Sequence, residues 1–302
     1  MNYILSVENI VKRYANHTAL NGVSLSVPTG SIYGLLGPNG AGKTSLIRII
    51  TQITAADEGN VFFNGEKLSP KHILQIGYLP EERGLYKKMS VGEQLIYLAQ
   101  LKGLSSKEAK NRLKYWIERF EMQSWWKKNV GDLSKGMQQK VQFIAAIIHE
   151  PTLLILDEPF TGFDPINASL VTEAILDLRK KGITIIFSTH RMETVEELCD
   201  YVAMIHRSKK VLDGKKSAIK KQYSTHTFLL ETTSPIQLPQ GFRLLKQEQL
   251  EENHYEISVE ILQGTTNDLL QAILPQTTIL ALKEKIPSMH DIFIEVVEKN
   301  QS

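Results

Sequence analysis

A glycine-rich segment near residue 40 has the residue types and spacing to hold a phosphorylated ligand. It fits the pattern G-x-x-x-x-G-K-[ST], and Ser45 follows it; its residues are Gly37, Pro38, Asn39, Gly40, Ala41, Gly42, Lys43 and Thr44. Glycines let backbone N–H groups turn towards phosphate oxygens, Lys43 can reach the outer phosphates, and the Thr44 hydroxyl can bind Mg²⁺. We therefore predict a site for nucleotide phosphates and Mg²⁺ here.

Two consecutive carboxylates could act on the same ligand. The apolar run Leu153–Leu156 is followed by Asp157 and Glu158, so a buried strand would project both acids from its carboxyl end, where α/β sheets place their ligands. We expect Asp157 to bind Mg²⁺ and Glu158 to orient or deprotonate an attacking water. An acidic strand-to-loop junction with no catalytic role is the alternative, and the phosphate-binding segment upstream argues against it.

The surrounding patterns predict an α/β domain that positions these residues. Strand patterns open the chain at Ile4–Val7 and Val23–Val27. A third, Ser31–Leu36, leads into the glycine-rich segment, and the helical pattern Lys43–Ile50 follows it. Unbroken apolar runs at Leu153–Leu156 and Ile183–Ser188 are typical of strands buried on both faces of a parallel sheet. A helical insert occupies about residues 85–150, with helices at Val91–Leu101, Ser105–Phe120 (with a capping box between Ser105 and Glu108) and Lys135–Ile148.

The composition changes near residue 220. Residues 221–302 carry six Lys+Arg and eleven Asp+Glu, a net charge of −5, whereas the whole chain has +2 and residues 1–220 therefore have +7. Short elements follow the change: strands at Thr227–Glu231, Phe242–Leu245, Tyr255–Ile261 and Thr278–Lys283, and helices at Asn267–Ile273 and Ser288–Glu298. We expect two domains, residues 1–220 and a small α+β accessory domain at residues 221–302.

Bulk properties exclude several classes of protein. The 302 residues are 42% hydrophobic and 23% charged, as in soluble globular proteins, and the small net charge gives no reason to expect a nucleic-acid partner. Cys199, expected on a helix over Val195–Tyr201, is the single cysteine, which fits a reducing cytosolic compartment. The strand pattern Ile4–Val7 at the start is not expected to be a signal peptide, and no apolar run is long enough to span a bilayer, so we expect any membrane role to come through a partner.

The segment Leu133–Met137 resembles the signature motif of the ATP-binding cassette (ABC) family, with Lys135 replacing a glycine and Met137 a glutamine. Taken alone, Ser134 would be a helix N-cap. The resemblance implies that Ser134 and Gly136 bind the γ-phosphate of ATP held by a second subunit, which the helix dipole and free N–H groups explain. It therefore implies ATP as the ligand and a dimer of ATPase subunits, which we expect to be identical.

Further positions extend the resemblance over about residues 3–220. The segment Thr161–Asp164 resembles the D-loop of the family, His190 resembles its switch histidine, and Tyr14 lies where the family stacks an aromatic ring on adenine. A lone histidine or tyrosine is more often structural, but the order of these residues favours the functional interpretation. The implied fold is the α/β P-loop NTPase cassette with a helical insert, followed by a small α+β domain.

One position departs from the family. The segment Ile76–Glu81 is similar to the Q-loop, but Glu81 replaces the usual glutamine. Glutamine offers Mg²⁺ a neutral carbonyl, whereas glutamate adds a negative charge that a metal tolerates and an adjacent γ-phosphate repels. We place Glu81 among the nucleotide-binding residues; a solvent-exposed position on a flexible loop is the alternative.

Two more segments, Lys88–Glu93 and Pro287–Glu295, resemble the sodium- and drug-exporter branch of the family, whose ATPases carry a C-terminal extension. This resemblance implies an ATP-hydrolysing transporter subunit that binds an integral membrane permease at the inner face of the cell membrane. A soluble ABC ATPase in translation or DNA repair is the alternative; the single, unsplit cassette without heptads argues against it. A catalytically silent regulator is disfavoured because Lys43, Asp157, Glu158 and His190 are all present.

Overall fold

The computed structural model describes residues 2–82 and 84–300. It divides into two compact units, residues 1–216 together with 296–302, and residues 217–295. The last helix, α9 (Met289–Lys299), therefore begins in the second unit and ends in the first. The domain boundary at residue 220 stays a prediction. Among the described residues, no helix combines the length and hydrophobicity needed to cross a bilayer.

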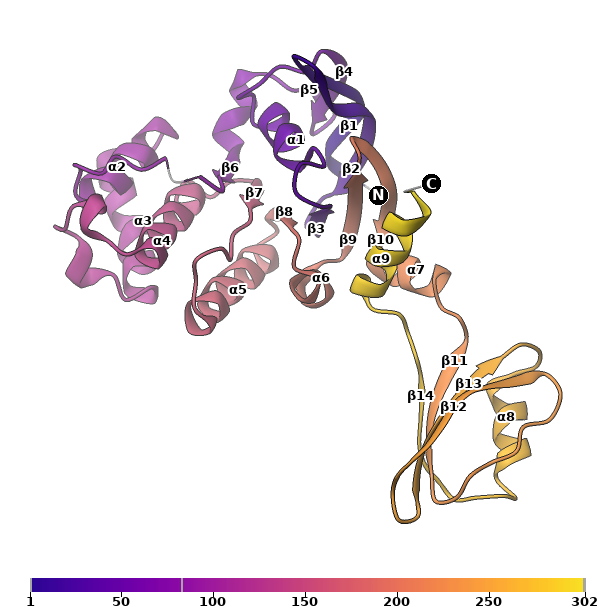
Figure 1. Ribbon diagram of the computed structural model, residues 1–302. Coiled ribbons are helices and arrows are strands. Elements are labelled where there is room, and N and C mark those ends of the chain that lie inside the picture. Colours follow the sequence, from indigo (N-terminus) through magenta and orange to yellow (C-terminus); the bar gives the residue numbers. More distant parts are fainter. Residues whose placement is uncertain (1, 83, 301–302) are drawn as a thin grey trace. The chain divides into compact units, whose positions relative to one another are not determined.

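A six-stranded sheet forms the centre of the first unit (Figure 1). Its order is β10-β9-β3-β8-β7-β6, and all neighbours are parallel except β10 and β9. The strands are β3 (Ile32–Leu36), β6 (Ile76–Leu79), β7 (Leu153–Asp157), β8 (Thr184–Thr189), β9 (Tyr201–His206) and β10 (Lys209–Lys215). Every residue of β3, β7 and β8 is buried, which explains their unbroken apolar runs and confirms these predicted strands.

The N-terminal strands form a separate antiparallel sheet. The short strands expected at Ile4–Val7 and Val23–Val27 are parts of two twelve-residue strands, β1 (Tyr3–Tyr14) and β2 (His17–Pro28). The sheet order is β2-β1-β4-β5, with β4 (Glu58–Phe63) and β5 (Glu66–Lys67). Register shifts interrupt the β1–β2 pairing at several places, so the hydrophobic alternation stops while the pairing continues. The predicted lengths were wrong for this reason.

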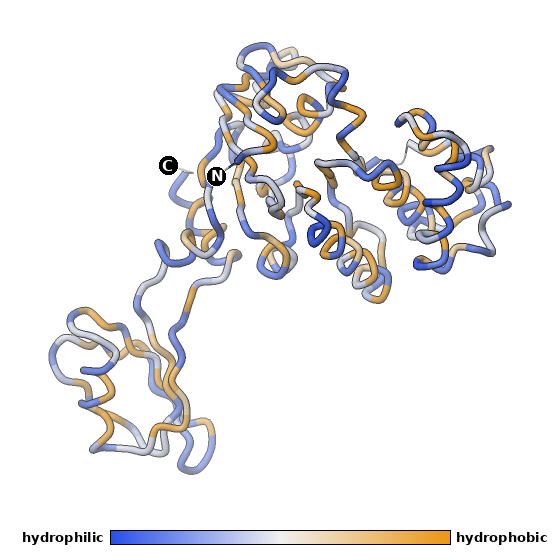
Figure 2. Tube along the Cα trace, turned by 180° about the vertical axis from the view of Figure 1, so that it is seen from behind, coloured by the Kyte–Doolittle hydropathy of each residue, from blue (hydrophilic) through white to orange (hydrophobic). Residues whose placement is uncertain are grey.

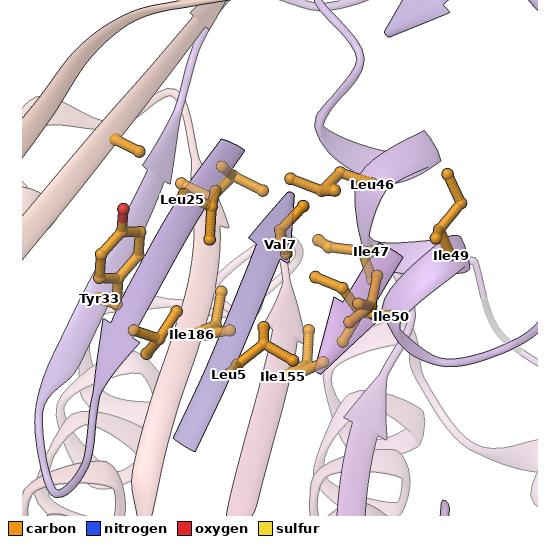
Figure 3. Packing of buried hydrophobic residues seen from close by; sticks show 14 of the residues in the cluster. Leu5, Val7, Leu25, Tyr33, Leu46, Ile47, Ile49, Ile50, Ile155 and Ile186 are labelled. Atoms are coloured by element: carbon orange, nitrogen blue, oxygen red, sulfur yellow. The ribbon is translucent and has the colours of Figure 1, made fainter. Parts of the chain in front are cut away.

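A hydrophobic core joins this sheet to the parallel sheet through helix α1 (Lys43–Ile50) (Figure 3). Leu5 of β1, Leu46 and Ile47 of α1, and Ile155 of β7 are all fully buried in it. Burial of a side chain of this size contributes about 1.5–3 kcal/mol. The core therefore fixes the start of α1, and with it the glycine-rich segment, against the end of β7. In Figure 1, α1 lies on one side of the parallel sheet, and α5 (Pro165–Lys180) and α6 (Met192–Leu198) lie on the other.

Three helices form the predicted insert: α2 (Val91–Leu101), α3 (Ser106–Arg119) and α4 (Lys135–Ile147). Each begins at a serine N-cap, Ser90, Ser105 or Ser134, whose hydroxyl accepts a hydrogen bond from the backbone N–H three residues later. Such caps satisfy N–H groups that have no partner within the helix. The capping box between Ser105 and Glu108 is confirmed.

Cys199 lies outside the helix that the sequence predicts around it. Helix α6 ends at Leu198, Cys199 is its C-cap, and strand β9 already begins at Tyr201. Burial raises the pKa of the Cys199 thiol to about 12. A Cβ atom on Gly34 would lie 2.7 Å from the Cys199 sulfur, so a glycine in β3 allows the end of α6 to pack closely on the sheet.

The second unit is a four-stranded antiparallel sheet with a helix and its own core. The sheet order is β12-β13-β11-β14. Its elements are β11 (Thr227–Thr232), β12 (Phe242–Glu251), β13 (His254–Ile261), α8 (Thr266–Ile273) and β14 (Ile279–Glu284). Hydrophobic and hydrophilic residues alternate along β13, and both kinds occur along the other strands (Figure 2). The core residues are Phe228, Leu230, Ile236, Ile257, Val259, Leu269 and Ile273. Strand β12 exceeds the predicted Phe242–Leu245, because its exposed polar second half has no hydrophobic pattern.

Candidate functional site

Four neighbouring strands of the parallel sheet end at one cavity of about 470 Å³. The glycine-rich segment follows β3, Glu81 follows β6, Asp157 and Glu158 lie at the end of β7, and His190 follows β8. Parallel strands bring their carboxyl ends to one edge, which is where α/β sheets bind ligands. The topology therefore gathers segments that lie up to about 150 residues apart in the sequence.

Most of the predicted site residues line this cavity. They are Tyr14, Asn39, Gly40, Gly42, Lys43, Thr44, Ser45, Glu81, Asp157, Glu158 and His190. Gly37, Pro38 and Ala41 belong to the same loop but lie behind its lining, where Gly37 and Pro38 contact Lys43 through their carbonyls. Ser134, Gly136 and Asp164 are in other parts of the first unit and do not line the cavity.

The structure adds residues to those predicted for the site. His17, Ala19 and Thr161 also line the cavity, and Ser188 donates a hydrogen bond to Asp157 Oδ1. Thr161 opens the segment that resembles the D-loop, and Ser188 lies two residues before His190, so both could have been found by extending those motifs. His17 and Ala19 depend on the β1–β2 hairpin, whose length the sequence did not predict.

Two glycines of the loop are required by close approach of the backbone. Gly37 has φ 147° and Gly42 has φ 115°, a region that strongly favours glycine. A Cβ atom would lie 2.2 Å from the Ile205 carbonyl oxygen at Gly37, and 2.3 Å from the Ala19 carbonyl oxygen at Gly42. Gly42 is also the N-cap of α1, so the free N–H groups and positive dipole end of this helix face the cavity.

The Lys43 ammonium places a positive charge at the cavity. It donates to the carbonyl oxygens of Gly37 at 2.7 Å and Pro38 at 3.1 Å. Burial lowers the pKa of Lys43, and the carboxylates of Glu158, Asp157 and Glu81 act in the opposite direction. The lysine is therefore held at the loop as a partly desolvated cation, which strengthens its attraction for an anionic ligand.

Asp157 has the geometry of a metal ligand. The side chain is almost fully buried, and Ser188 Oγ donates to its Oδ1. In the part of the chain that the structure describes, Oδ2 is buried without a hydrogen-bond partner. A buried unpaired carboxylate oxygen is costly, and the Thr44 hydroxyl group lines the same cavity. Carboxylate and hydroxyl oxygens are ligands that suit Mg²⁺, so this donor set fits the ion.

Glu158 and His190 form a hydrogen-bonded pair. His190 Nδ1 lies 2.8 Å from Glu158 Oε1, and because a carboxylate only accepts, the proton belongs on Nδ1. The Glu158 carboxylate is buried whereas the His190 ring is more than half exposed. The backbone of Glu158 has φ 50°, an unfavourable conformation for a residue with a side chain that is often retained at functional sites. Its N–H donates to the Ser188 carbonyl oxygen at 3.2 Å.

Glu81 lines the cavity and is also exposed. Its carboxylate raises the pKa of both Lys43 and Tyr78, although burial is the main influence on each. Burial, with a smaller contribution from the negative charge of Asp157, raises the pKa of Tyr78 to about 12. Glu81 therefore contributes negative charge to the cavity from its solvent side, and its role towards the nucleotide stays a prediction.

Comparison with known proteins identifies the family to which the chain belongs. The family described as ABC transporter matches residues 20–161, and the family described as ATP-binding protein DrrA1-3-like, C-terminal domain, matches residues 214–297. YhaQ of Bacillus subtilis (strain 168), an uncharacterized ABC transporter ATP-binding protein, is 39% identical over 295 residues, which cover 97% of this chain and 98% of YhaQ. The chain belongs to the ABC transporter ATP-binding family. It is an ATPase of that family and a transporter subunit, and the alternative of a soluble ATPase in translation or repair is not favoured.

Other members of the ABC family share the same length or the same fold. The linearmycin resistance ATP-binding protein LnrL of Bacillus subtilis (strain 168) is 30% identical over 304 residues, covering 97% of this chain and 98% of LnrL. A solved ATP-binding subunit of an ABC transporter superposes with a TM-score of 0.69 at 32% identity, covering 73% of this chain and 93% of that one. ATP binding and the predicted cassette fold with its small C-terminal domain are thereby confirmed.

The ABC signature and D-loop segments lie together in this chain. Ser134 caps α4, and a Cβ atom on Gly136 would lie 3.3 Å from the Gly162 carbonyl oxygen. Asp164 caps α5 and accepts from Asn167 N at 2.9 Å; this backbone hydrogen bond lowers the pKa of Asp164. Their place outside the cavity is compatible with a role towards the nucleotide of a second subunit, and that role stays a prediction.

Proposed function

We propose that this chain hydrolyses Mg-ATP as one of two identical ATPase subunits that drive export through a separate membrane permease. The observation that carries the proposal is the convergence of Lys43, Asp157 and the Glu158–His190 pair on one cavity at the ends of neighbouring strands. Export is supported by LnrL, whose name states linearmycin resistance, and by the DrrA1-3-like C-terminal domain.

The proposed roles of the residues follow from their chemistry. The Gly37–Thr44 loop and the start of α1 would hold the phosphates with backbone N–H groups, and Lys43 would balance their charge. Thr44 and the unpaired Oδ2 of Asp157 would hold Mg²⁺, which would offset negative charge on the phosphates when bound. The exposed ring of Tyr14, at the rim of the cavity, would stack on adenine.

Glu158 would orient and deprotonate the attacking water. Its carboxylate faces the cavity and is held by the Nδ1–H of His190. A buried carboxylate fixed by a hydrogen bond is preorganised, so little reorientation is needed when the water loses its proton. His190 is proposed to position Glu158 and to sense the γ-phosphate, since its ring also lines the cavity.

The test is the variant Glu158→Gln, which keeps the shape of the side chain and removes the base. We expect ATP hydrolysis to fall by about 10²–10⁴-fold, the usual contribution of a general base, while Mg-ATP binding remains. Because slow hydrolysis preserves bound ATP, the variant should accumulate as a dimer in Mg-ATP and as a monomer without it at low protein concentration. Light scattering during size-exclusion chromatography measures both states.

The matched control is Glu173→Gln, an exposed glutamate on α5 that does not line the cavity. It should hydrolyse ATP at the wild-type rate. Wild-type hydrolysis by Glu158→Gln would remove Glu158 from the catalytic role, and a Glu158→Gln protein that binds Mg-ATP but never dimerises would count against the two-subunit arrangement.

The proposed permease is tested by affinity purification of the full chain from detergent-solubilised native membranes. We expect an integral membrane protein to be recovered in near-equal amount, and vesicles containing both proteins to hydrolyse ATP faster than the chain alone. Recovery of the chain only from the soluble fraction would contradict the location at the inner membrane face, which we infer from the family.

A further inference from the structure

Strand β12 is an exposed edge of the second unit. Within residues 217–295, all of which the structure describes, β12 pairs with β13 alone. Nine of its ten residues, Phe242–Glu251, are exposed. An uncovered edge presents N–H and C=O groups that can pair with another strand, so proteins usually shorten, cover or guard such edges. This edge is long, and it carries exposed leucines as well as the charged side chains and register shifts that are common on edge strands.

Leucines are placed along this edge. Leu244 is 44% exposed, and Leu245 and Leu250 are each 50% exposed. Leu244 pairs with Val259 of β13, whose side chain is in the core of the unit. The hydrophobic face of the sheet therefore continues to β12, where it meets solvent. A neighbouring strand would remove these side chains from water.

The charges of β12 complement those of an antiparallel copy of the same strand. If Gln247 faces its own counterpart, Lys246 lies opposite Glu248 within the regular stretch of the strand. Counted along the sequence, Arg243 then falls opposite Glu251 and Leu244 opposite Leu250, beyond the register shifts of β12. Opposite charges and paired apolar side chains directly across a strand pair are stabilising. If the second copy were parallel and in register, each charged residue would face the same residue of the other copy, and the like charges would repel each other.

Symmetry selects this register. Along an antiparallel pair, directly opposed residues alternate between hydrogen-bonded and non-hydrogen-bonded pairs. A two-fold axis between two residues would make two successive opposed pairs identical, which this alternation does not allow. The axis must therefore pass through a residue that faces its own counterpart, and Gln247 at the centre of Arg243–Glu251 is such a residue. Register shifts in the β12–β13 pairing lie outside Lys246–Gln249, so the stretch around the axis is regular.

The opposite edge of the sheet lacks this property. Strand β14 has six residues, Ile279–Glu284, with Lys283 and Glu284 adjacent at one end. If an antiparallel copy is centred on Leu282, both charges face apolar residues of β14; if it is centred on Ala281, Lys283 faces Ile279 and Glu284 lies beyond the end of the opposite strand. Self-complementarity therefore belongs to β12 and is no general feature of the edges of this sheet.

We propose that β12 pairs with β12 of a second copy of this chain, with the two-fold axis at Gln247, to join the two four-stranded sheets into one of eight strands. The pairing uses no residue of the nucleotide cavity. It therefore goes beyond the proposed ATPase function, and it predicts self-association in the absence of nucleotide, where ATP-dependent closure cannot occur.

The experiment measures association of the full chain by sedimentation velocity in nucleotide-free, magnesium-free buffer over a range of concentrations. The wild type should form dimers. Lys246→Glu and Glu248→Lys each place like charges opposite one another at two symmetric positions, so each should weaken dimerisation by about tenfold, given the cross-strand energies of charged pairs. The double variant K246E/E248K restores opposite charges and should dimerise like the wild type.

Mixing the two single variants gives a sharper result. In a mixed dimer, the carboxylate introduced by Lys246→Glu faces the ammonium introduced by Glu248→Lys, and the unchanged glutamate of the first variant faces the unchanged lysine of the second. A heterodimer should therefore form at concentrations where either variant alone is monomeric. The matched control is Lys283→Glu on β14, which should associate like the wild type. A wild type that stays monomeric throughout, single variants that associate as tightly as the wild type, or a mixture without heterodimer would each overturn the proposal.

Discussion

The first unit buries Lys43, Asp157 and Glu158 around its cavity, whereas the second unit, described throughout residues 217–295, buries no charged side chain. Burial of a charge lowers stability unless another group compensates for it. In the first unit these charges lie around a cavity, where an anionic ligand can balance the charge of Lys43 and a metal ion can balance that of the carboxylates. The second unit has an ordinary neutral core, so its functional chemistry lies on its surface.

The largest test of this contrast is Lys43→Ala. The variant loses the ammonium that contacts the Gly37 and Pro38 carbonyls and leaves the carboxylates of the cavity unbalanced. We expect ATP affinity to fall by about 100-fold or more, since hydrogen bonds to charged groups contribute up to about 3 kcal/mol, and hydrolysis to be lost. Equilibrium dialysis with labelled ATP measures the change.

The matched control for that variant lies in the other unit. Lys283→Ala removes an exposed lysine from β14 and should leave ATP affinity unchanged. If Lys43→Ala bound ATP as the wild type does, the buried lysine would have a structural role and the contrast between the units would fail.

An intermediate effect is expected from Leu230→Ala in the core of the second unit. Leu230 is fully buried, so its truncation should destabilise that unit by about 2–5 kcal/mol. Hydrogen exchange should increase across β11 and β13 while ATP binding by the first unit is retained. Leu274→Ala, at an exposed position, is the control and should change neither. Parallel loss of ATP binding and second-unit protection would show that the two units fold as one.

The smallest effect is expected from Glu81→Gln. Because Glu81 adds negative charge on the solvent side of the cavity, its neutralisation should strengthen ATP binding by about two- to fivefold, a range set by the weakness of exposed charge interactions. The difference should shrink at high salt. Glu82→Gln is the control, since Glu82 is exposed but does not line the cavity. Weaker binding by Glu81→Gln in the presence of Mg²⁺ would indicate that the carboxylate acts as a metal ligand.

The sequence predicted the parallel strands and the residues at their ends, because strands buried on both faces and a glycine-rich loop leave strong local patterns. It predicted strands β1, β2 and β12 as too short. These strands contain bulges or face solvent, and neither condition maintains the alternation by which strands are recognised.

The sequence predicted the site residues that belong to a local motif, and it did not predict those that reach the site through packing of distant segments. Ala19 reaches the cavity through the β1–β2 hairpin, and its carbonyl oxygen limits residue 42 to glycine. The contact between Ser188 and Asp157 joins two strands that are 31 residues apart in the chain, and only their pairing in the sheet brings them together.

The path of the chain also bears on how the protein is made. Because residues 296–300 belong with residues 1–216, the ATPase unit is interrupted by the whole of the second unit. Domains generally fold during synthesis in the order in which they leave the ribosome. Here the first unit begins to emerge before the second, but it lacks part of its structure until the last turn of α9 has emerged. By that time the sheet of the second unit is already available to fold. A chain whose synthesis ends after the nucleotide site but before α9 would contain the catalytic residues and would lack residues 296–300 of the first unit.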